Sequence, residues 1–316
     1  MEIPSRWIWC KLSINLKHIP IKNGDGMKIV VCMKLGLDVT IPSIINPASG
    51  LVDETLLDYR MDGSSIAALE MALRLKEKHR ADISVVSIAP ESADSLLKEV
   101  YALGADQIFR IWHENLEDAD AYQKGVTIAA LLRDMAPDLV LCGARSEDMG
   151  SGTVPAALAE MMNFSQVTNV AADIELLNQD SILAFRRLEQ GAREKLQVQL
   201  PAVVSVDLTA IGMPYAPLDD YLAAMDKFIE HVEIFDLGLS SIDISSWNTL
   251  NRLVNVAQQK PVSKSIYTPP SELDPLDRIR AIVSGGLQQK TGEVVQGDAE
   301  ELAEKAFQFL LQNGFC

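Results

Sequence analysis

The stretch Asp138–Glu160, DLVLCGARSEDMGSGTVPAALAE, decides the fold of this chain. It opens with an apolar run of strand length, Asp138–Cys142, and closes with helical periodicity over Val154–Met162. Between them, Gly143 to Gly152 supplies small and polar residues, with Met149 as the one bulky apolar side chain. The sequence therefore predicts a strand, a small-residue turn and the start of a helix.

A turn of this kind is suited to holding phosphate. The first N–H groups of a helix have no intrahelical partner and lie at the positive end of the helix dipole, so they attract anions. Glycines let the backbone approach a ligand without a Cβ in the way. The alternative is an ordinary connection capped by Ser151 or Thr153. The stretch is neither a Walker loop nor a GxGxxG fingerprint.

The chain before this stretch alternates between strands and helices. The predicted strands are Lys28–Met33, Asp82–Ile88 and Gln107–Ile111, and the predicted helices are Ser64–Lys78, Ser92–Leu103 and Asp118–Met135. Such alternation predicts an α/β fold, a doubly wound, mostly parallel and Rossmann-like sheet with helices on both faces. The long stretch Lys34–Tyr59 is expected to be a functional loop or a hairpin.

After Phe164 the pattern changes to strands joined by short polar turns. The predicted strands, Val167–Leu176, Ser181–Leu188, Glu194–Gln199 and Ala202–Val206, indicate an antiparallel addition to the sheet. A short helix is expected at Leu218–Phe228, then a strand at Ile279–Val283 and a helix at Asp298–Gln312. The expected organisation is a disordered extension (1–26), an α/β domain with a docking arm (27–239), a linker (240–264) and an extended C-terminal strand–helix arm (265–316).

Composition excludes some classes of function. The 316 residues carry a formal net charge of −16, which argues against nucleic acid as a partner. The four cysteines are far apart and have no metal-ligand spacing, so a reducing, cytoplasmic location is expected. No apolar run approaches the roughly 18 residues that span a bilayer, so no membrane insertion is expected.

Ligands of doubly wound sheets bind beyond the carboxyl ends of the strands, where strand order reverses. The segments Cys32–Lys34, Ser87–Pro90 and Gly143–Thr153 follow three such strands, and Asp62–Ser65 opens the first crossover helix on the same side. The three loops are expected to share one ligand. Lys34 ends the first strand at this edge.

Charged residues in the turn admit two interpretations each. Glu147 and Asp148 are either a metal or acid/base pair or solvated loop charges, and adjacent loop residues usually point apart. Arg145 either meets a phosphate or an acidic partner, or is solvated. The four histidines are scattered and have no nucleophile motif, so the sequence offers no catalytic constellation and no metal site.

Several segments together resemble the beta subunit of electron-transfer flavoprotein. The segments are the strand Lys28–Lys34, the helix Ala68–Lys78, the turn Ala102–Asp106, Pro137–Gly143 (PDLVLCG) and Leu200–Asp207 (LPAVVSVD). The resemblance implies an electron carrier subunit, rather than a stand-alone catalyst, that binds an adenine nucleotide. It also implies a heterodimer with an alpha subunit that carries FAD. The pocket of this subunit would hold AMP or a second FAD.

The resemblance places the nucleotide contacts in the loops named above. These residues are Cys32, Lys34, Asp62, Gly63, Ser64, Ser65, Ile88, Gly143, Ala144, Arg145, Ser146, Asp148, Gly150, Ser151, Gly152, Thr153 and Val154. It further implies a segment that docks a dehydrogenase or oxidoreductase, at Tyr215 and Leu218.

The chain departs from the family's pattern at three places. Asp62-Gly63 replaces Asn-Pro, the loop Ser146–Ser151 is shorter, and the lysine-rich run after the docking segment is reduced to Lys227 within Ala223–Ile229. These differences predict a divergent paralogue that serves another dehydrogenase or oxidoreductase complex. Two alternatives of similar fold are an ATP-binding regulatory protein of the universal-stress type and an ATP-cleaving enzyme.

Overall fold

A computed structural model describes residues 26–38, 40, 45–46, 53, 58–117, 119–210, 214–240, 268–283 and 297–312. The chain divides into two units, Met1–Gln258 and Gln259–Cys316. The expectations for residues 1–25 and 241–264 lie outside the described residues.

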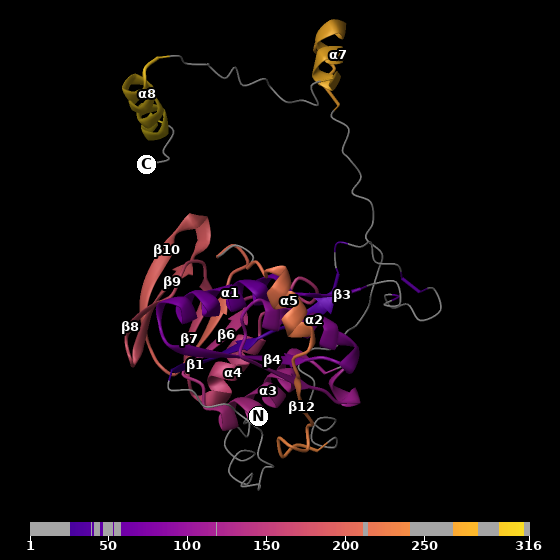
Figure 1. The fold of residues 1–316 in the computed structure, drawn as a ribbon. Helices are drawn as coiled ribbons and strands as arrows, with labels where there is room; N and C mark the ends of the chain where they lie inside the picture. Colours follow the sequence, from indigo (N-terminus) through magenta and orange to yellow (C-terminus); the bar gives the residue numbers. More distant parts are fainter. Residues whose placement is uncertain are drawn as a thin grey trace, which may run out of the picture. The chain divides into compact units, whose positions relative to one another are not determined.

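The first unit is built on one large sheet, in which ten strands are described (Figure 1). Its order is β10-β9-β7-β11-β6-β1-β4-β5-β12, and β8 pairs with β9. The parallel part consists of β1 (Met27–Cys32), β4 (Ala81–Ile88), β5 (Gln107–Ile111), β6 (Leu139–Gly143), β7 (Ser165–Val170), β11 (Ala202–Val206) and β12 (Glu230–Val232). Strand order reverses between β1 and β6, because β4 and β5 follow β1 on one side and β6 pairs on its other side.

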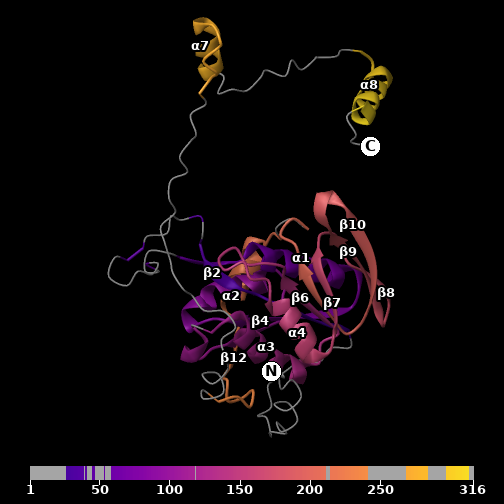
Figure 2. The ribbon, with the colours of Figure 1, turned by 180° about the vertical axis from the view of Figure 1, so that it is seen from behind.

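Helices cover both faces of this sheet, as Figures 1 and 2 show from opposite sides. One hydrophobic cluster joins the sheet to α1 (Gly63–Lys78), α2 (Asp94–Ala102) and α5 (Leu218–Met225). A second cluster joins the opposite face to α3 (Ala121–Met135) and α4 (Val154–Met162). The predicted doubly wound α/β fold is therefore confirmed.

The antiparallel addition is also confirmed, with one correction. Strands β9 (Ser181–Arg187) and β10 (Arg193–Gln199) pair antiparallel at the sheet edge. The single strand predicted at Val167–Leu176 is wrong, because it is two strands, β7 and β8 (Glu175–Asn178). The chain leaves the ladder between them, where Ile174 enters the core and Asp173 pairs with Arg74 of α1 at 3.1 Å.

The loop after β1 folds back as a hairpin, one of the two expected outcomes. Strand β2 (Leu35–Leu37) pairs antiparallel with β3 (Tyr59–Met61). Strand β12, which pairs parallel with β5, has only three residues and was not predicted.

Helix starts follow capping chemistry more closely than periodicity. Helix α3 begins at Ala121 instead of the predicted Asp118, because Asp120 and Gln123 form a reciprocal capping box. Helix α2 begins at Asp94, after a 3₁₀ turn at Glu91–Ala93. Helix α5 ends at Met225, three residues before the predicted end.

The second unit contains α7 (Pro275–Val283) and α8 (Ala299–Gln312). The strand predicted at Ile279–Val283 is wrong, because this segment is the end of α7. Pro275 at the first helical position favours a helix, and Leu276, Ile279 and Val283 recur at helical spacing. The predicted C-terminal helix is confirmed as α8.

Candidate functional site

The buried carboxylate of Asp62 joins three segments at the carboxyl edge of the sheet. One oxygen, Oδ2, caps α1 by accepting hydrogen bonds from the Ser65 amide (3.0 Å) and the Ser64 hydroxyl (2.5 Å). The other oxygen, Oδ1, accepts a hydrogen bond from the amide of Glu147 in the turn after β6 (2.8 Å). The Asp62 amide donates to the carbonyl of Lys34 after β1 (3.0 Å). Asp62 therefore fixes the α1 start relative to both neighbouring loops.

A glycine allows α1 to pack directly against the end of β6. An ideal Cβ on Gly143 would lie 3.0 Å from the carbonyl carbon of Ser64 and would overlap its hydroxyl. The oxygen of that hydroxyl lies 2.8 Å from the carbonyl oxygen of Arg145. The predicted closeness of Asp62–Ser65 to the turn after β6 is thus a direct contact.

The turn itself is held by its backbone. The Ala144 amide donates to the carbonyl of Val206 in β11 at 2.8 Å, and the Gly150 amide donates to the carbonyl of Ser146 at 3.1 Å. Gly152 has φ +61°, and a Cβ there would lie 2.8 Å from the Ala144 carbonyl oxygen. The turn therefore closes tightly before α4 begins, and a side chain at position 152 would not fit.

The two carboxylates of the turn point to different cations. Asp148 accepts a hydrogen bond from the Lys34 ammonium at 2.5 Å, and Glu147 pairs with Arg60 of β3 at 3.1 Å. Arg60 also pairs with Asp38 at 3.3 Å. Glu147 and Asp148 therefore point apart, as expected of adjacent loop residues, but the expectation that they are solvated is wrong, because each is ion-paired. Both help to fasten the turn to the hairpin.

The surroundings of Asp148 favour its ionised form. Desolvation alone would raise its pKa, but hydrogen bonds from Lys34, Ser146 and the Met149 amide, with the charge of Lys34, lower the pKa below its ordinary value. The Lys34 ammonium also donates to the Ser146 hydroxyl at 3.2 Å. Lys34 is therefore engaged by the turn.

The start of α4 differs from the start of α1. No side chain caps α4: Thr153 at its N-cap makes no capping hydrogen bond, and its hydroxyl lies 3.4 Å from that of Ser151. Pro155 follows within the first turn, so Val154 and Ala156 supply the first amide donors. Arg145 is exposed close to Gly152, and no ion pair of its side chain is found among the described residues. The N-terminus of α4, together with Arg145, thus presents amide donors and a positive charge to an anion.

The remaining predicted residues lie at the same edge. Cys32 ends β1 and is the register partner of Cys142 in β6, and both thiols are free and buried. Ile88 ends β4 and is half-buried against the α3 face. The structure therefore brings the ends of β1, β4 and β6 together with the start of α1.

Comparison with known proteins agrees with this architecture. The family model "Electron transfer flavoprotein domain" matches residues 49–233, more than half of the chain. The electron transfer flavoprotein subunit beta of Methylophilus methylotrophus is 30% identical over 230 residues, covering 72% of this chain and 87% of that protein. The chain belongs to the electron transfer flavoprotein family, as a beta-type subunit. The corresponding subunit of Bacillus subtilis (strain 168) is 27% identical over 248 residues, covering 78% of this chain and 94% of that protein.

Family membership confirms the resemblance found in the sequence and supports a role in electron transfer. The match with the electron transfer flavoprotein domain includes the α1 start, the turn after β6 and α4. Helices α7 and α8 lie beyond the matched residues. The match favours the electron-transfer interpretation over the two ATP-based alternatives.

The segment predicted to dock a partner is highly exposed in this beta-type chain. Tyr215 is 86% exposed and Leu218, the first residue of α5, is 69% exposed. Leu222 and Phe228 continue this apolar surface. Exposed apolar side chains clustered in this way are typical of protein contact sites.

Sequence reasoning missed the contribution of the β2–β3 hairpin to the site. Arg60 binds both Glu147 and Asp38, but a lone arginine between irregular segments gave no sequence signal. In the part of the chain that the structure describes, no cluster of three or more metal-ligating side chains is found. No helix there is long and apolar enough to cross a membrane.

Proposed function

We propose that this chain binds an adenine nucleotide, AMP or FAD, at the turn after β6. In this proposal it passes electrons between a dehydrogenase and an acceptor, as a heterodimer with an alpha subunit that carries FAD. The observation that carries the nucleotide proposal is the uncapped start of α4, beside the glycine turn and beside Arg145, for which the described residues supply no ion pair.

The phosphate groups would lie at α4 and not at α1. The amides of Val154 and Ala156, the hydroxyls of Ser151 and Thr153 and the Arg145 guanidinium are the groups that would hold them. The start of α1 already holds a negative charge, because the Asp62 carboxylate accepts a hydrogen bond from the Ser65 amide. A second anion there would meet a negative charge, so Asp62–Ser65 would form a wall of the pocket.

The surrounding residues would position the nucleotide. Lys34 and Arg60 keep the turn in place through Asp148 and Glu147. Cys32 and Ile88 would provide apolar contact at the ends of β1 and β4. When a flavin is bound, the flavin supplies the redox chemistry, and the role of this chain is placement and docking.

Calorimetry on the heterodimer, produced with its alpha-type subunit, tests the nucleotide proposal. AMP, ADP and FAD are titrated into the wild type, Gly152→Ala and Gly191→Ala. Both glycines have positive φ, but a Cβ on Gly191 meets nothing within 4 Å and lies away from the turn. Gly152→Ala should weaken binding by about tenfold or more, since it displaces the turn, and Gly191→Ala should not. Wild-type protein that binds none of the three nucleotides would contradict the proposal.

The docking segment has a separate test. Leu218→Asp places a charge on the exposed surface of α5. Electron transfer from the partner dehydrogenase should slow, while nucleotide affinity stays unchanged.

The free, buried thiols of Cys32 and Cys142 support a reducing cytoplasmic location, which cell fractionation tests.

A further inference from the structure

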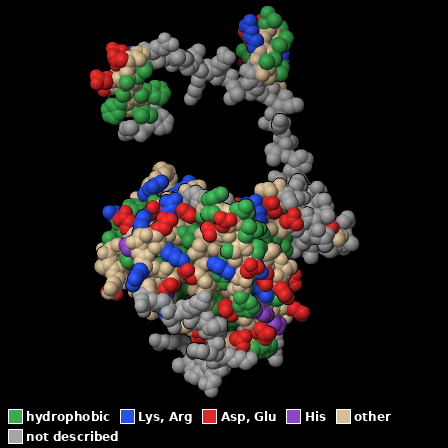
Figure 3. Space-filling model, in the orientation of Figure 1, with side chains coloured by type: hydrophobic (Ala, Val, Ile, Leu, Met, Phe, Trp, Pro, Cys, Tyr) green, Lys and Arg blue, Asp and Glu red, His purple; other side chains and the backbone are tan. Residues whose placement is uncertain are grey.

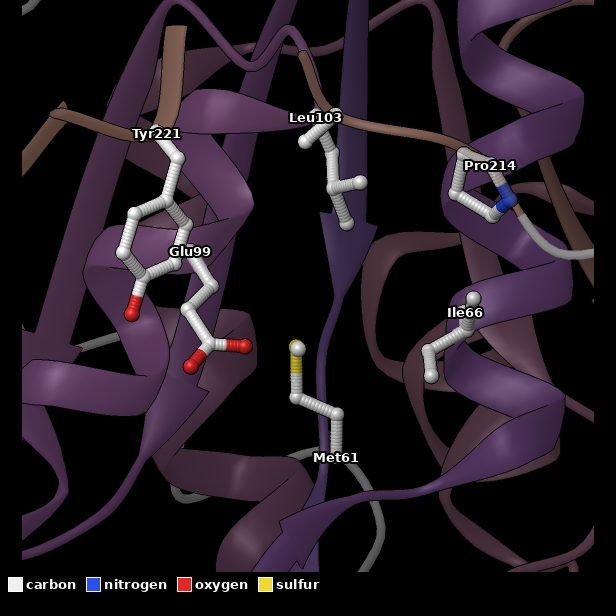
Figure 4. Close-up of a pocket in the computed structure, with 7 residues that line it drawn as sticks. Met61, Ile66, Glu99, Leu103, Pro214 and Tyr221 are labelled. Carbon is white, nitrogen blue, oxygen red and sulfur yellow. The ribbon is translucent and has the colours of Figure 1, made fainter. Parts of the chain in front are cut away.

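A cavity lies beside the docking segment, and no residue of the turn after β6 lines it. Its volume is about 150 Å³. The cavity is formed between β3, α1, α2, α5 and the segment before α5, and its lining residues are Met61, Ile66, Glu99, Leu103, Pro214, Ala216 and Tyr221. Figure 4 shows six of these side chains arranged around the open space. The walls are largely apolar, with one carboxylate among them.

That carboxylate belongs to Glu99 on α2, and no cationic partner for it is found among the described residues. Glu99 is half-buried, and within the described ranges its side chain forms no ion pair. The nearby lysines are engaged elsewhere: Lys98 donates to the Met225 carbonyl at 2.6 Å, and Lys227 lies 4.8 Å from the centre of the Tyr101 ring. A carboxylate that is partly withdrawn from water and unpaired favours a cation supplied from outside.

We infer that this cavity receives one arginine side chain of a partner protein. The aliphatic stem lies against Met61 and Leu103, as long basic side chains do on apolar surfaces. The planar guanidinium forms a charge-assisted, bidentate pair with Glu99. Tyr221, 37% exposed at the cavity, offers a ring face on which a guanidinium stacks better than an ammonium.

The surface around the cavity fits a basic partner segment. From Pro214 to Glu230 there are four acidic residues and one basic residue, Lys227, which gives a formal charge of −3. Hydrophobic side chains gather over the α5 region, with both acidic and basic side chains beside them (Figure 3). An arginine flanked by apolar residues therefore matches both the cavity and its rim. The identification of the partner as the electron donor rests on the proposed function. The binding of an arginine side chain in the cavity does not rest on it.

Methyl NMR of the full chain labelled at its methionines tests the cavity directly. The Met61 methyl signal, assigned with Met61→Leu, is followed during titration with N-acetyl-arginine amide. The same titration with N-acetyl-citrulline amide, which has a similar shape and no charge, is the matched control. Glu99→Gln removes the carboxylate charge, and Asp219→Asn removes a charge outside the cavity lining.

The arginine probe should shift the Met61 signal in the wild type and in Asp219→Asn. The citrulline probe should bind the wild type at least about tenfold more weakly than the arginine probe does. The arginine probe should bind Glu99→Gln more weakly by the same factor, because in both cases a charge-assisted hydrogen bond is lost. Equal affinity for both probes, equal affinity in Glu99→Gln, or no shift of Met61 would each overturn the inference. The titration contains no nucleotide, so its failure is distinct from a failure of the nucleotide proposal.

Discussion

Replacing Asp62 by alanine, compared with removal of a helix cap elsewhere, should show how much the bond between the α1 start and the turn after β6 contributes to stability. The carboxylate is 4% exposed and serves two purposes at once. It caps α1 through the Ser65 amide at 3.0 Å, and it binds the Glu147 amide of the turn after β6 at 2.8 Å. Asp62→Ala removes both.

The expected loss can be worked from these two contacts. Loss of an N-cap costs about 1 kcal/mol. Loss of a hydrogen bond to a charged, buried acceptor costs about 2 kcal/mol more. The free energy of unfolding should fall by about 3 kcal/mol, which for a domain of this size lowers Tm by roughly 6–12 °C.

Asp120→Ala is the matched control. Asp120 caps α3 by accepting from the Gln123 amide at 2.9 Å, and α3 packs in the hydrophobic cluster on the face of the sheet opposite to α1. Its removal should cost about 1 kcal/mol. Urea unfolding followed by far-UV circular dichroism gives both values, and calorimetry with AMP shows whether the turn still binds nucleotide.

The difference between the free energies of unfolding lost in Asp62→Ala and in Asp120→Ala measures the contribution of the bond to the Glu147 amide. A gap of about 2 kcal/mol, with weakened nucleotide binding in Asp62→Ala alone, supports the cross-link. If the two variants lose equal stability, the bond to the Glu147 amide contributes nothing and the reasoning fails.

Three further predictions concern the same edge of the sheet. Gly143→Ala should lower the free energy of unfolding by about 1–3 kcal/mol in a urea titration, because a Cβ meets the α1 backbone at 3.0 Å; unchanged stability would contradict this packing. A hydrogen bond with Cys32, and burial, raise the pKa of the Cys142 thiol well above its ordinary value, so native alkylation by iodoacetamide should be slow near neutral pH and rapid after unfolding, as read by peptide mass spectrometry. The pKa of Asp148 is lowered from its ordinary value of 3.8. The pair with Lys34 should therefore stabilise the turn fully at pH values above 3.8, and this stabilisation should be lost as the pH falls through the lowered pKa. Hydrogen exchange of the turn amides should show this loss, and Lys34→Met should reduce the pH dependence, because the hydrogen bonds from Ser146 and the Met149 amide remain.

The turn and α4 were predictable because their signals are local. A strand-length apolar run, a glycine-rich turn and renewed helical periodicity stand next to one another in Asp138–Glu160, and α4 begins at the predicted Val154. The convergence of loops followed from the alternation of strands and helices, since carboxyl ends of parallel strands share one edge.

The errors arose where short segments depend on distant contacts. Strand β12 exists because β5 offers it an edge, and three residues carry no periodicity of their own. The break between β7 and β8 depends on Asp173 reaching α1. Ile279–Val283 looks like a β-branched strand until Pro275 and Leu276 are included, when helical spacing becomes visible. The bond from Glu147 to Asp62 spans 85 positions of sequence, and no local pattern encodes it.

Strand β3 contributes side chains to two places in the molecule. Arg60 holds the turn through Glu147, whereas its neighbour Met61 lines the cavity beside α5. Adjacent residues of a strand point to opposite sides, so this short segment contacts the turn with one side chain and the cavity with the next. With a nucleotide at the turn and a partner's arginine in the cavity, as proposed, a shift of this segment by either ligand would alter the binding of the other, and thermodynamic linkage requires the same factor in both directions. The pairing of β2 with β3 would then couple the nucleotide site to the docking surface.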